Sequence, residues 1–154
     1  MPDVPGNHPG PVAATLPPDI RAAIVAHARA EYPNEACGII VGDRAAAAGG
    51  RALRFVPMRN AAASPLRYRI DDEQLLRLTI ETDDADEAFW AIVHSHVRSP
   101  AVPSPTDVGQ ATIYRDPLYV LVSLSADEAD AATDEPSVRA WRILDGEVAE
   151  VVLR

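Results

Sequence analysis

Two near-continuous apolar runs constrain the fold more than any other feature of this chain. Residues 89–93 read Phe-Trp-Ala-Ile-Val, and residues 118–124 read Leu-Tyr-Val-Leu-Val-Ser-Leu. Runs without polar alternation are typical of strands that are buried on both faces, as in a sheet covered by helices. Ser104-Pro105, between the two runs, opens a helix, because Pro suits the first turn. The pattern predicts an α/β domain with strands 89–93 and 118–124 near its centre.

The rest of the chain supplies further helices and strands. Asp71, with Gln74 three residues later, has the arrangement of a helix capping box. Asp145-Gly146 lies between two alternating runs, which predicts a β-hairpin. The apolar face of the second helix is expected to include Leu75, Leu78 and Ile80. We therefore expect helices at about 18–32, from 71 and from 104, and further strands at 37–41, 52–58, 68–70, 138–144 and 148–153.

Residues 1–16 are rich in Pro and Gly and predict a disordered tail, which leaves residues 17–154 as one domain. No apolar run approaches the roughly 18 residues that span a bilayer, and no basic segment followed by an apolar stretch begins the chain. The single cysteine, Cys37, cannot form an internal disulfide. We expect a cytoplasmic protein.

The charge of the chain argues against nucleic-acid binding. The formal net charge is −9, and the 14 basic residues are all Arg and form no cluster. Nucleic-acid binders usually carry a basic patch. One cysteine also cannot build a cysteine-rich zinc site, so any metal must be bound by His and carboxylate side chains.

A candidate metal site follows the first apolar run. His94 and His96 are two residues apart at the end of a predicted strand, so they project from the same face. Asp107 lies in the first turn of the next helix, which can fold back toward them. Three protein ligands leave a fourth position for water, as in catalytic zinc sites.

Simpler interpretations exist for each part. Two His residues at a strand end are often ordinary surface or core residues. Ser104 and Asp107 also suit a helix start, with Ser as the N-cap and the acid at the third position. The two parts together, directly after a buried strand, favour the metal site. Other metal folds with a His-x-His pair fit less well, since the metallo-β-lactamase pattern needs Asp and His just after it, where this chain has Arg98 and Ser99.

The full pattern resembles the motif of JAMM (MPN+) metallopeptidases. That motif is an upstream Glu, His-x-His, seven residues, Ser, two residues and Asp, which corresponds here to Glu35, His94, His96, Ser104 and Asp107. Residues 18–154 are similar to the short bacterial members, including stretches 57–60, 64–65, 68–69 and 119–123. One departure is Val97, where many relatives have Pro. The resemblance implies the MPN (JAB/JAMM, cytidine-deaminase-like) fold, a curved mixed β-sheet flanked by about three helices.

The resemblance also implies roles for these residues. One Zn²⁺ per chain would be bound by His94, His96 and Asp107, Glu35 would transfer protons, and Ser104 would stabilise an oxyanion. Taken alone, Glu35 could be an exposed loop residue and Ser104 only a helix cap. Three other residues, Ser95, His27 and Cys37, are expected to be structural.

The implied reaction is cleavage after the C-terminal Gly-Gly of a ubiquitin-like sulfur-carrier protein, with release of cysteine. Two alternatives stay open for the same chemistry: a general deubiquitinase-like isopeptidase and a peptidase of short peptides. A third alternative is a non-catalytic MPN scaffold, although such scaffolds have lost ligands that this chain keeps. The oligomeric state is open.

Overall fold

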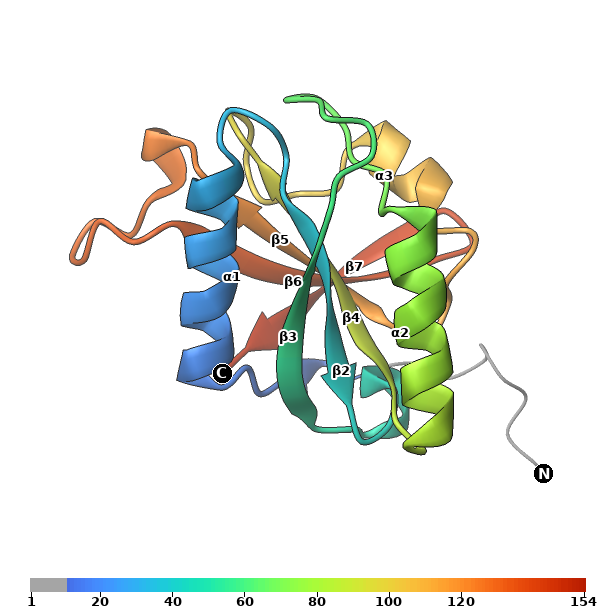
Figure 1. Ribbon diagram of the computed structural model, residues 1–154. Coiled ribbons are helices and arrows are strands. Elements are labelled where there is room, and N and C mark those ends of the chain that lie inside the picture. Colours follow the sequence, from blue (N-terminus) through green and yellow to red (C-terminus); the bar gives the residue numbers. More distant parts are fainter. Residues whose placement is uncertain (1–10) are drawn as a thin grey trace.

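A seven-stranded mixed β-sheet forms the centre of the structure, a computed structural model that describes residues 11–154 (Figure 1). Its order is β1-β7-β6-β5-β4-β2-β3. β4 pairs in parallel with β5, and β1 with β7, while the other neighbours are antiparallel. The strands are β1 (Ala13–Ala14), β2 (Cys37–Gly42), β3 (Ala52–Met58), β4 (Ala88–His96), β5 (Leu118–Ser123), β6 (Ser137–Leu144) and β7 (Glu147–Leu153), and the helices are α1 (Pro18–Glu31), α2 (Asp72–Asp84) and α3 (Pro105–Gln110), with short 3-10 helices η1 (Ala46–Ala48) and η2 (Ala126–Glu128).

Helices cover the two faces of the sheet, with α1 on one side and α2 and α3 on the other (Figure 1). Side chains of β2 alternate between these layers. Ile40 packs in the cluster that contains Ile24 of α1, whereas Ile39 and Val41 pack in the cluster that contains Leu78 of α2. β5 is buried along its whole length and β4 from Trp90 to His96, which confirms buried strands beneath helices on both faces. Within residues 11–154, no helix is both long and apolar enough to cross a membrane.

The predicted α/β fold with a mixed sheet and three helices is confirmed. The hairpin at Asp145-Gly146 is also confirmed, because both residues have positive φ, 51° and 80°, and connect β6 to β7. These values suit the two central residues of a type I′ turn, which Asp-Gly favours.

Residues 11–16, which the sequence placed in a disordered tail, are ordered. Ala13–Ala14 form β1, which pairs with the end of β7. Leu16 is buried, and its N–H donates to the carbonyl of Arg154 at 2.9 Å. Residues 11–16 are therefore part of the domain, because the far end of the chain supplies a strand for them to pair with. The rest of the predicted tail, residues 1–10, lies outside the described residues.

The predicted strand at 68–70 is wrong. Residues 61–69 form a loop between β3 and α2, and only a single bridge joins Asn60 to Ile70. Tyr68 is buried under the sheet instead of pairing along it. Two backbone hydrogen bonds flank this bridge, from Ala61 N–H to the Arg69 carbonyl and from Asp71 N–H to the Arg59 carbonyl, and the pairing goes no further because α2 begins at Asp72.

Helix α2 begins as predicted but differs in two details. The side chain of Asp71 accepts from the backbone N–H of Gln74, as an N-cap. The Gln74 side chain does not complete the capping box; its Oε1 accepts from the backbone N–H of Arg59 at 2.6 Å. Leu78 is buried, but Ile80 is 54% exposed, so Ile80 does not belong to the buried face.

Candidate metal centre

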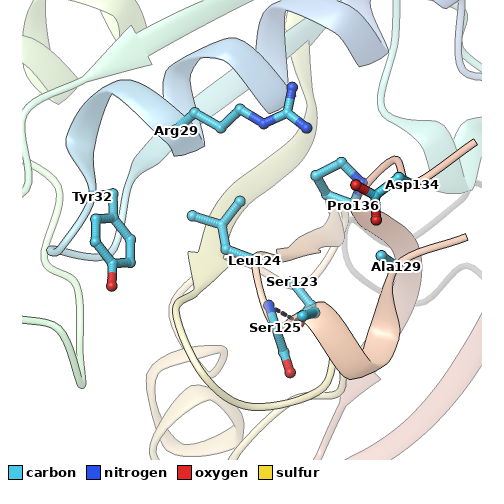
Figure 2. A pocket seen from close by; sticks show the side chains of 9 residues that line it. Arg29, Tyr32, Ser123, Leu124, Ser125, Ala129, Asp134 and Pro136 are labelled. Atoms are coloured by element: carbon cyan, nitrogen blue, oxygen red, sulfur yellow. Dashed lines mark hydrogen bonds between the residues drawn. The ribbon is translucent and has the colours of Figure 1, made fainter.

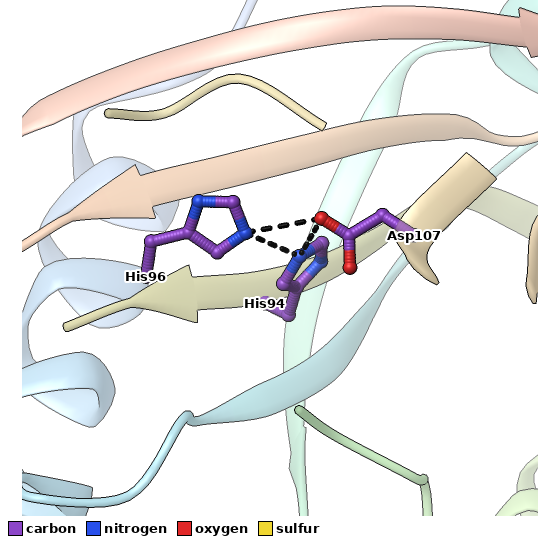
Figure 3. Close-up of side chains that lie close together, drawn as sticks. All are labelled: His94, His96 and Asp107. Atoms are coloured by element: carbon purple, nitrogen blue, oxygen red, sulfur yellow. Dashed lines mark hydrogen bonds and ion pairs between the residues drawn. The ribbon is translucent and has the colours of Figure 1, made fainter. Parts of the chain in front are cut away.

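Strand β4 and helix α3 bring the predicted ligands together. His94 and His96 are the last alternate residues of β4, and both side chains lie on the face beneath α3. The loop that follows folds back, so that Asp107 in the first turn of α3 meets them (Figure 3). Both the two-residue alternation of the strand and the start of the helix are local features. The sequence spacing of His94, His96 and Asp107 was therefore sufficient to predict that their side chains come together.

Three ligand atoms converge on one point (Figure 3). Asp107 Oδ2 lies 3.0 Å from His96 Nε2 and 3.2 Å from His94 Nε2, and the two Nε2 atoms are 3.2 Å apart. All three side chains are buried. Two imidazoles and one carboxylate facing each other in this way form a group able to hold a metal ion.

The charges of the cluster are strongly coupled. Burial lowers the pKa of His94 below its ordinary value, and hydrogen bonding to Asp107 only partly opposes this. Burial acts in the same direction on His96, but the hydrogen bond to Asp107 and the carbonyl of Pro100 raise its pKa overall. Although burial opposes it, hydrogen bonds from both histidines hold the pKa of Asp107 well below its usual range. Asp107 is therefore an anion that faces two ring nitrogens.

The geometry of Asp107 suits both roles that the sequence left as alternatives. Its Oδ2 accepts from the backbone N–H of Ser104 at 2.8 Å, and its own N–H donates to Ser104 Oγ at 3.1 Å, which is a complete capping box. The same Oδ2 faces the histidines. The cap thus aims the carboxylate at the cluster, so capping and metal binding are compatible.

Glu35 is held beside the cluster by the sheet. β2 and β4 are antiparallel, with Cys37 opposite His94. One residue further, Ser95 and Ala36 are joined by two hydrogen bonds: Ser95 N–H donates to the Ala36 carbonyl at 3.0 Å, and Ala36 N–H donates to Ser95 Oγ at 2.7 Å. These contacts agree with a structural part for Ser95, and its position places Glu35 next to the end of β4.

The Glu35 carboxyl group is buried, not exposed as a loop residue would be. Glu35 is only 4% exposed, and its Oε1 has no hydrogen-bond partner among the described residues. Burial raises the pKa of Glu35 to about 7, with a lowering effect from His96 and a raising effect from Asp107. A buried carboxyl group without a partner, beside a cluster of ligands, is typical of an acid–base group.

A cleft of about 440 Å³ brings Glu35, Ser104 and His96 to one surface. Its other walls are mostly apolar and come from the end of α1, the loop after β3 and the loop after β4, through Tyr32, Pro33, Pro65, Leu66, Val97, Arg98 and Ser99. Every predicted site residue therefore lies either in the cluster or in this adjoining cleft.

A second hollow, of about 360 Å³, shares Tyr32 with the first cleft as a lining residue (Figure 2). Arg29 of α1 and Asp134 of the loop before β6 line it from opposite sides. It is lined by none of the predicted site residues, and its polar groups are a mixture of one guanidinium, one carboxylate and three hydroxyls, which define no reaction.

Two residues near the site were not predicted to act there. Asn60 is buried, and its side chain joins the carbonyl of Glu35 to the loop that follows β3. Tyr68 stacks on His94, with ring centroids 4.3 Å apart. A single Asn or Tyr in a loop forms no sequence motif with its neighbours. Asn60 and Tyr68 were indicated only because stretches 57–60 and 68–69 of this chain resemble the family.

The remaining candidates, Cys37 and His27, make structural contacts away from the cluster. Cys37 is buried, and its thiol faces the carbonyl of Met58, while burial raises its pKa to about 12. His27 Nε2 lies 3.0 Å from the carbonyl of Cys37 and so ties α1 to β2. Neither side chain belongs to the metal-ligand group.

Comparison with known proteins agrees with this geometry. A CysO-cysteine peptidase of Mycobacterium tuberculosis is 42% identical over 135 residues, which cover 86% of this chain and 84% of that protein. A probable TtuB-protein conjugate cleaving protease of Thermus thermophilus is 34% identical over 151 residues, 97% of this chain and 88% of that protein. The solution structure of a protein from Desulfitobacterium hafniense superimposes with a TM-score of 0.74 at 28% identity, covering 92% of this chain and 91% of the other.

The family model described as prokaryotic homologues of the JAB domain matches residues 17–144. This range contains β2, β4 and α3, and with them Glu35 and the three converging ligands. The resemblance inferred from the motif is confirmed, and the chain belongs to the family of prokaryotic homologues of the JAB domain.

Proposed function

We propose that this chain is a zinc-dependent amide hydrolase that cleaves after the C-terminal Gly-Gly of a ubiquitin-like sulfur-carrier protein and releases cysteine. One observation carries the proposal: three converging ligand atoms, from His94, His96 and Asp107, lie beside the buried carboxyl group of Glu35. The name of the Mycobacterium tuberculosis relative supports the substrate, because that protein is a CysO-cysteine peptidase.

The donor set fits zinc. His94, His96 and Asp107 would hold the ion, and an imidazole–carboxylate set of three leaves one coordination position open. When bound, zinc would supply Lewis acidity, which polarises an amide carbonyl and acidifies a water molecule. A metal-free MPN scaffold is not favoured, because the three side chains are buried and already face one another.

Glu35 would move the protons. As a carboxylate it accepts a proton from the attacking water, and as a carboxylic acid it returns that proton to the leaving amine. With a pKa of about 7 in the absence of a cation, both forms are accessible near neutral pH. A cation held by the neighbouring ligands would favour the carboxylate, which is the form required to begin the reaction.

Ser104 would stabilise the developing oxyanion. Its Oγ accepts from the N–H of Asp107, so the hydroxyl hydrogen is still available to donate. Ser104 lines the same cleft as Glu35 and His96. Its position is fixed by the capping box, and such pre-positioned donors are the effective ones in oxyanion stabilisation.

The shape of the cleft suits a tail without side chains. Pro33, Pro65 and Val97 form apolar walls close to the reacting groups. A Gly-Gly tail can lie against walls of this kind and be held through its main chain, as an added strand would be. Selection of the carrier then depends on its globular surface, while the released group can be a single amino acid.

A second candidate is cleavage of an isopeptide bond between such a carrier and a protein lysine. It is favoured by the Thermus thermophilus relative, whose name describes cleavage of TtuB-protein conjugates. The same ligands and the same Glu35 would serve both reactions, so the leaving group alone distinguishes them.

Mass spectrometry of a purified Gly-Gly carrier from the same organism, extended by one C-terminal cysteine, tests the proposal. Zinc-loaded enzyme should remove one cysteine residue, and a zinc chelator should prevent the loss. A Lys-linked conjugate of the same carrier is the parallel substrate. Cleavage of that conjugate without cleavage of the cysteine adduct would overturn the first function in favour of the second.

A further inference from the structure

The two histidines of the cluster are held in different ways. His96 directs its Nδ1 at the carbonyl of Pro100, 2.7 Å away, which leaves Nε2 as the atom that faces the cluster. His94 also directs Nε2 at the cluster, but its Nδ1 is buried and has no hydrogen-bond partner among residues 11–154. Metal-binding histidines usually donate their second ring N–H to an acceptor, which fixes the plane of the ring. His94 lacks that restraint within the described chain.

A stacked ring occupies the face of His94. Tyr68 lies with its centroid 4.3 Å from that of His94, and the planes differ by 20°. Both residues are buried, Tyr68 with 7% and His94 with 1% of their surface exposed. Rotation of the imidazole out of its plane would collide with the Tyr68 ring, so the contact restrains the same angle that a hydrogen bond would otherwise fix.

Tyr68 is itself anchored on both sides. Asn60 Nδ2 donates to the carbonyl of Arg67 at 3.1 Å, and Asn60 Oδ1 accepts from the N–H of Arg69 at 3.0 Å, so both chain neighbours of Tyr68 are fixed. Gln110 Nε2 donates to the Tyr68 carbonyl at 3.3 Å. Gln110 is the last residue of α3, the helix that carries Asp107, so Tyr68 links two of the three ligands.

We propose that Tyr68 is a positioning residue for the metal centre: its aromatic ring, stacked on His94, orients the imidazole for metal binding. The ring and not the hydroxyl is responsible. A metal ion draws electron density from the imidazole, and the electron-rich face of a phenol attracts an electron-poor ring, so the stacking strengthens when metal binds. The inference rests on the proposed function only in assuming that the cluster binds zinc.

The test is zinc affinity, measured by competition with a chromophoric chelator, for Tyr68→Phe and Tyr68→Leu. Phe keeps the ring, so its zinc dissociation constant should stay within about 3-fold of wild type, since only the hydroxyl is removed. Leu keeps an apolar core side chain without a ring, and its dissociation constant should rise on the order of 10- to 100-fold, as for other outer partners of metal ligands. Turnover of Tyr68→Leu should recover as zinc is raised.

Leu78→Ala is the matched control, because Leu78 lies in the same buried cluster and is on α2. It should lower the thermal midpoint at least as much as Tyr68→Leu while leaving zinc affinity near wild type. Tyr68→Leu that folds and binds zinc as tightly as wild type overturns the proposal. So does Leu78→Ala with an equal loss of affinity, which would indicate general destabilisation. A wild-type protein that binds no zinc would instead overturn the proposed function.

Discussion

Two stretches of chain meet at the candidate metal centre and contribute in different ways. The stretch 94–107 supplies the three converging side-chain atoms and Ser104, and in the proposed mechanism its side chains act through charge and coordination. The loop 60–70 supplies no ligand, yet Asn60 holds the Glu35 carbonyl and Tyr68 stacks on His94. The first stretch therefore defines which chemistry is available, and the second defines how accurately the groups are held. Variants at His94, His96 or Asp107 should abolish function, and variants in the loop 60–70 should weaken it.

The largest effect is expected from the ligands. His94→Ala or Asp107→Ala should remove the zinc and the activity together, because two remaining ligands cannot form a three-ligand site. Zinc content by elemental mass spectrometry, expected at about one per chain in wild type, measures this. His27→Ala is the matched control, since His27 lies outside the cluster, and it should keep its zinc. A ligand variant with full zinc content would show that the metal binds elsewhere.

Glu35→Gln should separate proton transfer from metal binding. The amide has the same shape but cannot take up a proton, so turnover should fall ~10²–10⁴-fold while zinc stays bound. Glu31→Gln, an exposed glutamate at the end of α1, should change neither quantity. Wild-type turnover in Glu35→Gln would mean that another group acts as the base.

Ser104 tests whether the helix cap also acts in catalysis. Ser104→Ala should lower turnover on the order of 10²-fold, as the loss of one oxyanion donor does. It should also lower the free energy of unfolding by ~1 kcal/mol through loss of the cap. Ser104→Thr keeps both the hydroxyl and the cap and should stay close to wild type. If Ser104→Ala loses stability but no turnover, Ser104 is a cap alone.

The buried Glu35 carboxyl group predicts a pH-dependent stability of the metal-free protein. Burial raises its pKa from 4.5 to about 7, so the folded state retains a proton that the unfolded state has released. The resulting stabilisation is present below pH 4.5 and is lost as pH rises toward 7. The shift corresponds to on the order of 3 kcal/mol of unfolding free energy.

Denaturant unfolding of chelator-treated protein at pH 4.5 and 7 measures this difference. Glu35→Gln does not titrate, so it should lack this part of the pH dependence. The raised pKa of His96 acts in the same direction, because its stabilisation is also lost as pH rises, and it is present in both proteins. Identical pH profiles for wild type and Glu35→Gln would contradict a raised pKa at Glu35.

The smallest effect on the metal centre is expected from Asn60, in the loop 60–70. Asn60→Asp keeps the acceptor for Ala62 and Arg69 but removes the donor to Glu35 and Arg67. Leaving buried carbonyls unpaired should cost about 1–3 kcal/mol of unfolding free energy, with zinc retained. Asn34→Asp, whose side chain makes none of these contacts, is the control. A loss of zinc in Asn60→Asp would show that the loop does more than hold the neighbouring groups in position.

Short-range patterns were sufficient for much of this protein. The apolar run 89–93 predicted β4, Asp145-Gly146 predicted its hairpin, and the His-x-His pair with Ser104 and Asp107 predicted the converging ligands. Each of these depends on the period of a strand, the φ values of a turn or the first turn of a helix, and such rules act over a few residues.

Other features depended on partners far away in the chain. Residues 13–14 form a strand because β7 lies beside them, and Ile80 points to solvent because α2 packs through Leu78. Glu35 is buried because β2 pairs with β4, and Tyr68 reaches His94 because Asn60 holds its neighbours. The burial of a carboxyl group and the contact between two rings are set by which segments pack together, and only the tertiary structure decides that.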